Sequence, residues 1–169
     1  MHRRTKITFA ICSVIGLTVL VLWLPVQALV MRRVCQMNYL RNAAFHMHMF
    51  STDHNGMFPT NVAEVQVYAS TAMHFHCPGR PLQSPVRWAN INEWMDYIYV
   101  YWPEGEKTPH DYPHMYDRRL ANHGGAGINI ALVDGSSFWD GHGQWLRKFA
   151  EAHPECQIQL PEDMLKEPR

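Results

Sequence analysis

Histidines and cysteines are the residues of this chain best suited to chemistry. The sequence contains 11 His and 4 Cys among 169 residues, and imidazole and thiolate groups bind zinc or act as catalytic groups. His74 and His76 would share one face of an extended segment, with Cys77 adjacent. His46 and His48 would point to nearly opposite sides of a helix, so they could not chelate together. A structural zinc site draws on four such ligands at recognisable spacing. No framework of that kind is visible, so we expect neither a resident metal nor a cofactor.

His123 is the strongest catalytic candidate, because it precedes the glycine pair Gly124 and Gly125. This glycine-rich stretch lacks the following helix and the Lys-Ser/Thr pair of a phosphate-binding loop. We therefore expect His123 to hydrogen-bond backbone groups in the loop before the next hairpin. Asp134 and Gly135 supply the turn chemistry of that hairpin, and the serines after them do not form a nucleophile elbow. The sequence thus predicts no catalytic residue and a protein that is not an enzyme.

A long helix is the element expected to position the rest of the domain. Ile7–Met31 carries no charged residue and is long enough to span a bilayer, which takes ~20 apolar residues. A signal peptide with a cleavage site at Val26–Ala28 is the alternative, although the apolar region exceeds the ~7–15 residues of a signal core. We expect a transmembrane first half and an amphipathic second half. The apolar residues that continue at helical spacing are Val30, Val34, Met37, Leu40, Ala44, Met47 and Phe50.

Three strands are expected after this helix. Asp96–Trp102 alternates aromatic and β-branched residues. Ile128–Val133 and Ser136–Trp139 flank an Asp-Gly pair, which supplies the two positive-φ positions of a tight hairpin turn. The polar stretch Glu104–Leu120 is predicted to be a loop. One face of the resulting sheet can cover the apolar stripe of the helix. The expected fold is therefore α+β, with a long N-terminal helix and a small antiparallel sheet packed on its C-terminal half.

The expected organisation has three parts. Residues 1–31 form an N-terminal transmembrane anchor, residues 32–152 a folded domain, and residues 153–169 an extended or loosely ordered tail. Lys plus Arg and Asp plus Glu number 15 each, so the net charge is zero. That balance argues against a nucleic-acid partner, which would favour a basic excess. The flank before the apolar run is short and purely basic, so we expect the N-terminus in the cytoplasm and the domain on the other side.

Several short motifs follow one another in order and cover most of residues 7–150. They are Cys35–Asn42 (CQMNYLRN), Asp53–Pro59 (DHNGMFP), Phe75–Pro78 (FHCP), Tyr97–Tyr101 (YIYVY), and Asn122–Gly125 (NHGG) with Ile130–Gly135 (IALVDG). In these motifs the chain resembles the type IV prepilin-like and type II secretion pseudopilin-like proteins that carry a His-x9-Asp-Gly signature. The resemblance implies a pilin-like fold with a structural motif rather than a reactive site. The residues of that motif are His123, Gly124, Gly125, Asp134 and Gly135.

Two departures from that family change the expected function. His123 and Asp134 are separated by ten residues, one more than in the family signature. The processing motif is also missing, since no Gly precedes the apolar run and no Glu precedes Glu64. In the family, that Gly marks the cleaved bond and an early Glu supports assembly. The chain is therefore expected to escape prepilin peptidase and not to polymerise.

The resemblance and its departures together predict a non-catalytic structural subunit of a larger membrane protein complex. It would be a single-pass protein of the bacterial inner membrane with a periplasmic domain. Its partners would be other membrane subunits and the lipid bilayer. The alternatives are a minor pseudopilin of a type II secretion or type IV pilus machine, and a periplasmic His-rich metal-binding module.

The cysteines divide by their expected compartment. Cys12 lies in the predicted span and would be an inert small hydrophobe. The other three would face an oxidising periplasm, which leaves one cysteine without a partner. A bond between Cys35 and Cys77 would join the helix to the irregular segment, and the resemblance favours this pair. A bond between Cys77 and Cys156 would join the tail, and the absence of any disulfide is the third possibility.

Overall fold

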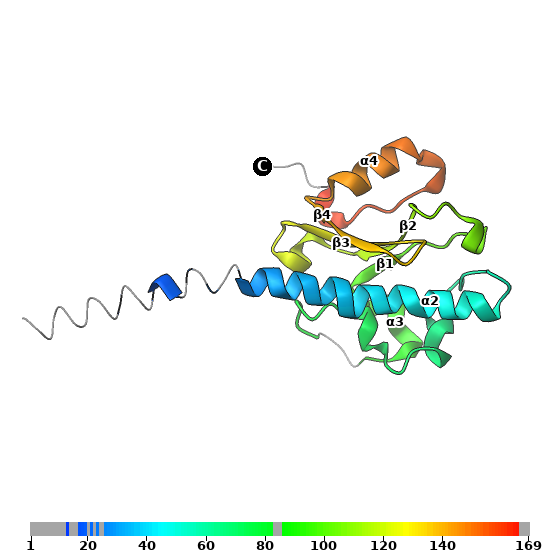
Figure 1. The fold of residues 1–169 in the computed structure, drawn as a ribbon, viewed down its shortest axis with the longest axis horizontal. Helices are drawn as coiled ribbons and strands as arrows, with labels where there is room; N and C mark the ends of the chain where they lie inside the picture. The colour runs from blue at the N-terminus through cyan, green and yellow to red at the C-terminus, as the bar shows by residue number, and fades with distance from the viewer. Residues whose placement is uncertain are drawn as a thin grey trace, which may run out of the picture.

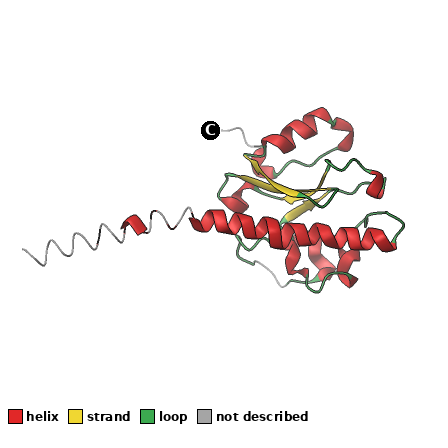
Figure 2. Cartoon of the chain, in the orientation of Figure 1, coloured by secondary structure: helices red, strands yellow, loops and turns green. Residues whose placement is uncertain are grey.

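The chain folds as a long helix against a small sheet, with short helical turns between the main elements (Figures 1 and 2). The structure, a computed structural model, describes residues 13, 17–19, 21, 23, 26–82 and 86–165. After a helical segment over residues 26–34, the elements are η1 (Cys35–Leu40), α2 (Arg41–Asp53), η2 (Val62–Val67), η3 (Ala72–Phe75), η4 (Trp88–Asn90), α3 (Ile91–Trp94), β1 (Tyr97–Tyr99), η5 (Gly105–Lys107), β2 (Pro113–Asp117), η6 (Leu120–His123), β3 (Gly127–Leu132), β4 (Ser137–Gly141), α4 (Gln144–Ala152), η7 (Pro154–Cys156) and η8 (Glu162–Met164).

One continuous helix runs over residues 26–53 and contains a π-helical stretch, η1. Its residues include many strong helix formers, among them Ala, Met, Leu and Arg. The predicted stop is confirmed: Asn55 and Gly56 take left-handed φ values of 56° and 80°. The Gly56 N–H donates to the carbonyl of Ser51 at 2.8 Å and satisfies an orphan carbonyl at the helix end.

The antiparallel sheet has four strands in the order β1-β2-β3-β4. Three were predicted, and the extra strand is β2, which lies inside the stretch predicted to be a polar loop. Its sequence, PHMYD, contains a proline and polar residues and shows no apolar alternation. All five of its residues are nevertheless buried, because β2 pairs on both sides with β1 and β3. The predicted first strand is shorter than expected and ends at Tyr99.

The β3–β4 hairpin forms at the predicted place with a different turn. Gly135 has a positive φ of 78°, but Asp134 does not have a positive φ. The Gly135 N–H donates to the carbonyl of Leu132 at 3.0 Å, and the Leu132 N–H donates to that of Ser136 at 2.9 Å. This pattern is that of a three-residue loop closed by a left-handed glycine, not of a two-residue turn.

The sheet is covered on both faces. The long helix packs on one face and α4 on the other (Figure 1). The core between helix and sheet includes Cys35, Leu40, Ala44, Met47, Tyr97, Met115 and Ala131. The core between sheet and α4 includes Ile98, Tyr116, Ile128, Ile130 and Leu146. Burying this apolar area on both faces is what fixes the sheet against the helix.

The C-terminal segment is part of the domain rather than a loose tail. Met164 is buried against the α4 core. The Tyr116 hydroxyl donates to the carbonyl of Gln159 at 2.5 Å. The backbone N–H groups of Leu120 and Ala121 donate to the Asp163 carboxylate at 3.0 and 2.9 Å. Described residues 153–165 therefore belong to the same folded unit as the sheet.

The predicted transmembrane anchor is contradicted. Among the helices that the structure describes, none is long and apolar enough to cross a membrane. The described helix over residues 26–53 carries Arg32, Arg33 and Arg41, whose charges interrupt an apolar window of bilayer length. Of the predicted anchor, residues 1–31, the structure describes residues 13, 17–19, 21, 23 and 26–31. The remaining anchor residues lie outside the described part of the chain. The single-pass topology and the inner-membrane localisation are corrected accordingly, while the α+β class stands.

Candidate functional site

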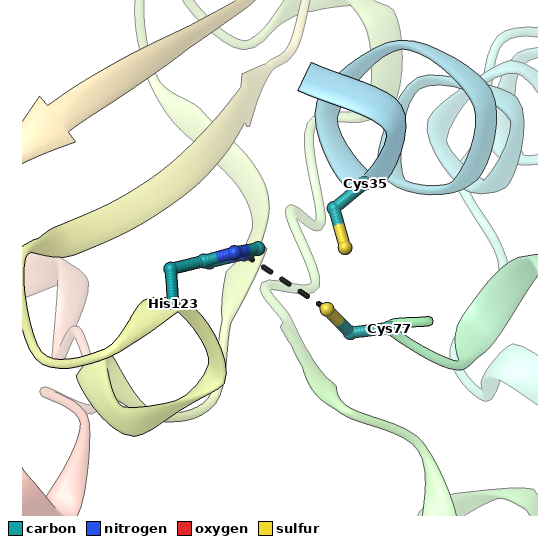
Figure 3. Close-up of side chains that lie close together, drawn as sticks. All are labelled: Cys35, Cys77 and His123. Atoms are coloured by element: carbon teal, nitrogen blue, oxygen red, sulfur yellow. Dashed lines mark hydrogen bonds between the residues drawn. The ribbon is translucent and has the colours of Figure 1, made fainter. Parts of the chain in front are cut away.

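Two cysteines and a histidine converge in the core where the long helix meets the sheet (Figure 3). Cys35 is the first residue of the π-helical η1, Cys77 follows η3, and His123 is the last residue of η6. Their two Sγ atoms and one ring nitrogen all lie within 4.8 Å of one another. Both cysteines are fully buried, and the His123 side chain is only 3% exposed. We call these three residues the thiol–histidine cluster.

Cys77 is held in place by a buried carboxylate. Its backbone N–H donates to Asp96 at 3.0 Å. Arg80 and His76 hold the same carboxylate, at 2.9 and 2.7 Å. The burial of Asp96 strengthens these contacts, since little water competes for the carboxylate. This network fixes the irregular segment after η3, and with it the direction of the thiol.

His123 is held by the sheet. Its Nε2 atom lies 3.1 Å from an Asp117 oxygen, 3.0 Å from the Asn129 side-chain nitrogen and 3.9 Å from the Cys77 sulfur. Backbone hydrogen bonding was expected at this residue, and the structure instead places Nε2 among side chains. Burial would lower the pKa of His123, but hydrogen bonds and charge from Asp117 and Cys77 raise that pKa to about 9. Gly124, with φ of 70°, ends η6 and lets the chain turn away.

The cluster does not have the geometry of a cysteine-based catalytic site. In a catalytic triad the acid holds one ring nitrogen and the nucleophile faces the other. Here Asp117 and Cys77 both face Nε2 of His123. A hydrogen bond with Cys35, together with burial, raises the pKa of the Cys77 thiol. A buried thiol with a raised pKa is a poor nucleophile, because the thiolate is the reactive form.

Polar atoms around the cluster lack hydrogen-bond partners. Among the described residues these include the Tyr97 hydroxyl and one side-chain oxygen each of Asp117 and Asn129, all of them buried. Tyr97 and Asp117 are directly paired across β1 and β2, and the Asn129 N–H donates to Asp117 at 2.6 Å. Each orphaned buried polar group carries a desolvation cost of about 1–3 kcal/mol. Several of them around two thiols and an imidazole mark this part of the core as unusually polar.

The predicted signature residues do not form one site. His123 lies before β3, and Asp134 and Gly135 lie after it, so the strand separates them by roughly 17 Å at ~3.3 Å per residue. Gly135 lies near His48, and the Asp134 N–H donates to the carbonyl of His110. The residues of the predicted His-to-Asp-Gly signature therefore lie at opposite ends of β3. Gly124 and Gly125 both take positive φ with open space beside them.

The cysteine pair favoured by the resemblance is brought together, but as free thiols. Cys35 and Cys77 are unbonded, as is Cys156, while Cys12 lies outside the described residues. The addition of His123 to the pair was not visible in the sequence, because the three residues belong to separate elements. The signal that could have found it is that each residue lies in one of the short sequence motifs Cys35–Asn42, Phe75–Pro78 and Asn122–Gly125.

The histidines first considered as ligands are used separately. His74 pairs with His46, ring nitrogen to ring nitrogen, at 2.8 Å. His76 contacts Asp96. The predicted neighbours His74 and His76 therefore do not act as a pair of ligands with Cys77.

Comparisons with protein-family profiles, with curated proteins and with solved structures find no match to this chain.

Proposed function

We propose that this chain is a non-catalytic structural subunit of a larger protein complex, built on a pseudopilin-like domain. The proposal rests on one observation: the first described turns of the long helix, from residue 26, expose apolar side chains. Val26, Leu29 and Val30 are 51%, 53% and 55% exposed. All five residues over 26–30 are exposed, and all of them except Gln27 are apolar.

The same helix changes character where the domain begins. From Cys35 onward its inward face is buried, with Cys35, Leu40 and Ala44 fully excluded from solvent. At the boundary the Arg32 guanidinium lies 4.5 Å from the centroid of the Trp139 ring, a cation–π contact with β4. One continuous helix thus links the exposed apolar segment to the packed core (Figure 1).

An exposed apolar surface of this kind favours a protein partner. Contiguous apolar surface left in water is costly, and in folded proteins it marks interaction sites. Residues 26–31 carry no charge, so the partner surface is expected to be apolar helices rather than an acidic or basic face. Four described apolar residues before this segment are exposed as well: Leu17, Val19, Val21 and Trp23 are 58–63% exposed.

The experiment is to compare two charged substitutions in the native host. Leu29→Glu places a carboxylate on the proposed contact helix. Val67→Glu is the control, because Val67 is also a branched apolar residue exposed to solvent, at 83%. Unlike Leu29, it lies on η2 within the folded domain. A tagged wild-type chain and the control should co-purify with one complex at fixed stoichiometry. Leu29→Glu should lose that complex while its domain stays folded.

Other outcomes overturn the proposal in distinct ways. A wild-type chain that stays monomeric and partner-free contradicts it. Co-purification with filaments or with secretion components supports the minor-pseudopilin alternative instead. Equal loss of the complex in both variants would assign the effect to charge in general rather than to the helix.

A further inference from the structure

We infer that the thiol–histidine cluster is a binding site for a thiophilic divalent cation, of which Zn²⁺ is the natural candidate. The ligands are Cys35 Sγ, Cys77 Sγ and His123 Nε2. This site is independent of the partner-binding role proposed above, since it lies inside the domain and not on the exposed helix.

The spacing of the three atoms fits a metal. Zn–S bonds of ~2.3 Å and Zn–N bonds of ~2.0 Å place tetrahedral ligand atoms about 3.5–3.8 Å apart. Cys77 Sγ and His123 Nε2 are 3.9 Å apart, and all three atoms lie within 4.8 Å of one another. A contraction of a few tenths of an ångström to about 1 Å brings the set to bonding geometry. Figure 3 shows the two sulfurs and the ring directed toward a common point.

The third ligand distinguishes a metal from a disulfide. A disulfide uses only the two sulfurs and gives no role to the imidazole. Here Nε2 of His123 can make one hydrogen bond at most, yet it faces three polar side chains within 3.9 Å. A bound cation would accept the lone pair of His123 Nε2 and would bind both sulfurs at the same time.

The orphaned polar atoms provide a second, independent observation. The fully buried Asp117 has one oxygen 3.1 Å from the ring of His123 and the other without a hydrogen-bond partner. The neighbouring Tyr97 hydroxyl also lacks a partner. Buried polar groups are almost always satisfied, so a group of orphans indicates a bound species. Asp117 is placed to complete the coordination as a fourth ligand.

Charge selects the ion. Binding forms two metal–sulfur bonds and one metal–nitrogen bond, and it releases the two thiol protons, with any proton on Nε2, to water. Two thiolates and a neutral imidazole give a net charge of zero with Zn²⁺ but minus one with Cu⁺. With the buried Asp117 carboxylate included, the total charge is minus one with Zn²⁺ and minus two with Cu⁺, so the zinc complex is better tolerated in a low-dielectric core.

A metal here would fix the orientation of the long helix. Cys35 belongs to the helix, Cys77 to the segment after η3, and His123 to the loop before β3. One ion would join these three segments at the place where the π-helical η1 begins. Metal-free chain should then hold the helix less tightly, because binding energy at such a site is also folding energy.

The test uses the full chain, purified under reducing conditions, with Zn²⁺ and Co²⁺ as probes. We expect one Zn²⁺ per chain by elemental analysis. Co²⁺ in its place should give thiolate charge-transfer bands and tetrahedral d–d bands. Cys77→Ser and His123→Gln should each weaken Zn²⁺ binding by roughly 100-fold or more, and Asp117→Asn by about 10–100-fold. Cys156→Ser is the matched control, because Cys156 is another free thiol among the described residues and forms a separate trio with His153 and Glu155.

Three results would overturn the inference. The first is a wild-type chain that takes up no Zn²⁺ and shows no thiolate–cobalt bands, a readout that needs no variant to fold. The second is loss of the metal in Cys156→Ser with retention in Cys77→Ser, which moves the site to the exposed trio. The third is a Cys35–Cys77 disulfide, seen by mass spectrometry, that persists under the reducing conditions that the test uses.

Discussion

Acid should destabilise this domain through His114, a histidine buried in an aromatic pocket on β2. Its side chain is fully buried, and neither ring nitrogen has a hydrogen-bond partner within the described structure. The ring centroid lies 4.3 Å from that of Phe58, 5.3 Å from that of Tyr99 and 6.0 Å from that of His48. Burial, with a smaller contribution from the charge of His48, lowers the pKa of His114 to about 3.

The size of the effect follows from the difference in protonation between the folded and unfolded chain. The unfolded chain binds a proton at this residue below a pH of about 6.5, while the folded domain does so only near its lowered pKa. Stability is therefore complete above a pH of about 6.5 and falls as the pH drops toward about 3. Each pH unit in this window costs about 1.4 kcal/mol, so a change to a pH of about 5 costs about 2 kcal/mol.

His46 adds a similar contribution. Burial, with a smaller effect from the charge of His74, lowers the pKa of His46 to about 4. A change to a pH of about 5 therefore costs roughly another 2 kcal/mol. Together the two residues would remove a large part of the ~5–15 kcal/mol that stabilises a typical domain.

The substitution that isolates the effect is His114→Leu. Leucine has a similar volume and leaves no polar atom in the pocket, so stability at neutral pH should change little. The variant should lose about 2 kcal/mol less than the wild type between pH values of about 7.5 and about 5. The assay is denaturant unfolding at both pH values, followed by tryptophan fluorescence in the presence of a chelator. His110→Gln is the control, because His110 is exposed.

An equal pH-dependent loss in His114→Leu and the wild type would refute this reasoning. It would mean that the buried ring is protonated in the folded domain without cost, or that the pocket opens before the acid acts.

Three further substitutions and one control test the fold. Asp140→Ala should destabilise the chain by about 1–2 kcal/mol in thermal or denaturant unfolding, because its carboxylate accepts the N–H groups of two residues in the first turn of α4 at 2.9 Å each. Gly127→Ala should lower the free energy of unfolding by about 3 kcal/mol or more, since φ is +154° and a Cβ would overlap the Asp140 carbonyl oxygen. Gly141→Ala is its control and should unfold like the wild type, because no atom lies within 4 Å of a Cβ placed there. Asp163→Ala should release the C-terminal segment and increase proteolysis there, measured by limited digestion and mass spectrometry, while unchanged digestion would contradict its anchoring role.

The fold was largely predictable where local patterns decide the structure. The apolar spacing from Val34 to Phe50 predicted the helix face that packs on the sheet, and Leu40, Ala44 and Met47 are indeed fully buried. The Asn-Gly stop gave the end of the helix. These features depend on residues close in sequence, which is why pattern alone was sufficient.

The failures have tertiary causes. The strand Pro113–Asp117 carries no strand pattern and is ordered by pairing with both of its neighbours. The predicted membrane anchor rested on apolar length, and in the described helix the apolar run ends at Arg32 and Arg33. The thiol–histidine cluster was invisible because its members come from three segments far apart in the sequence. Only the folded chain brings Cys35, Cys77 and His123 together.

The central claim is that the exposed start of the long helix is a contact surface for one protein partner. Site-specific photo-crosslinking in the native host tests this most directly, with the reactive residue placed at Leu29 and, for comparison, at Val67. The proposal predicts one crosslinked partner from position 29, recovered at fixed stoichiometry with the native complex, and no such product from position 67. The same products from both positions, or none from position 29, would contradict it.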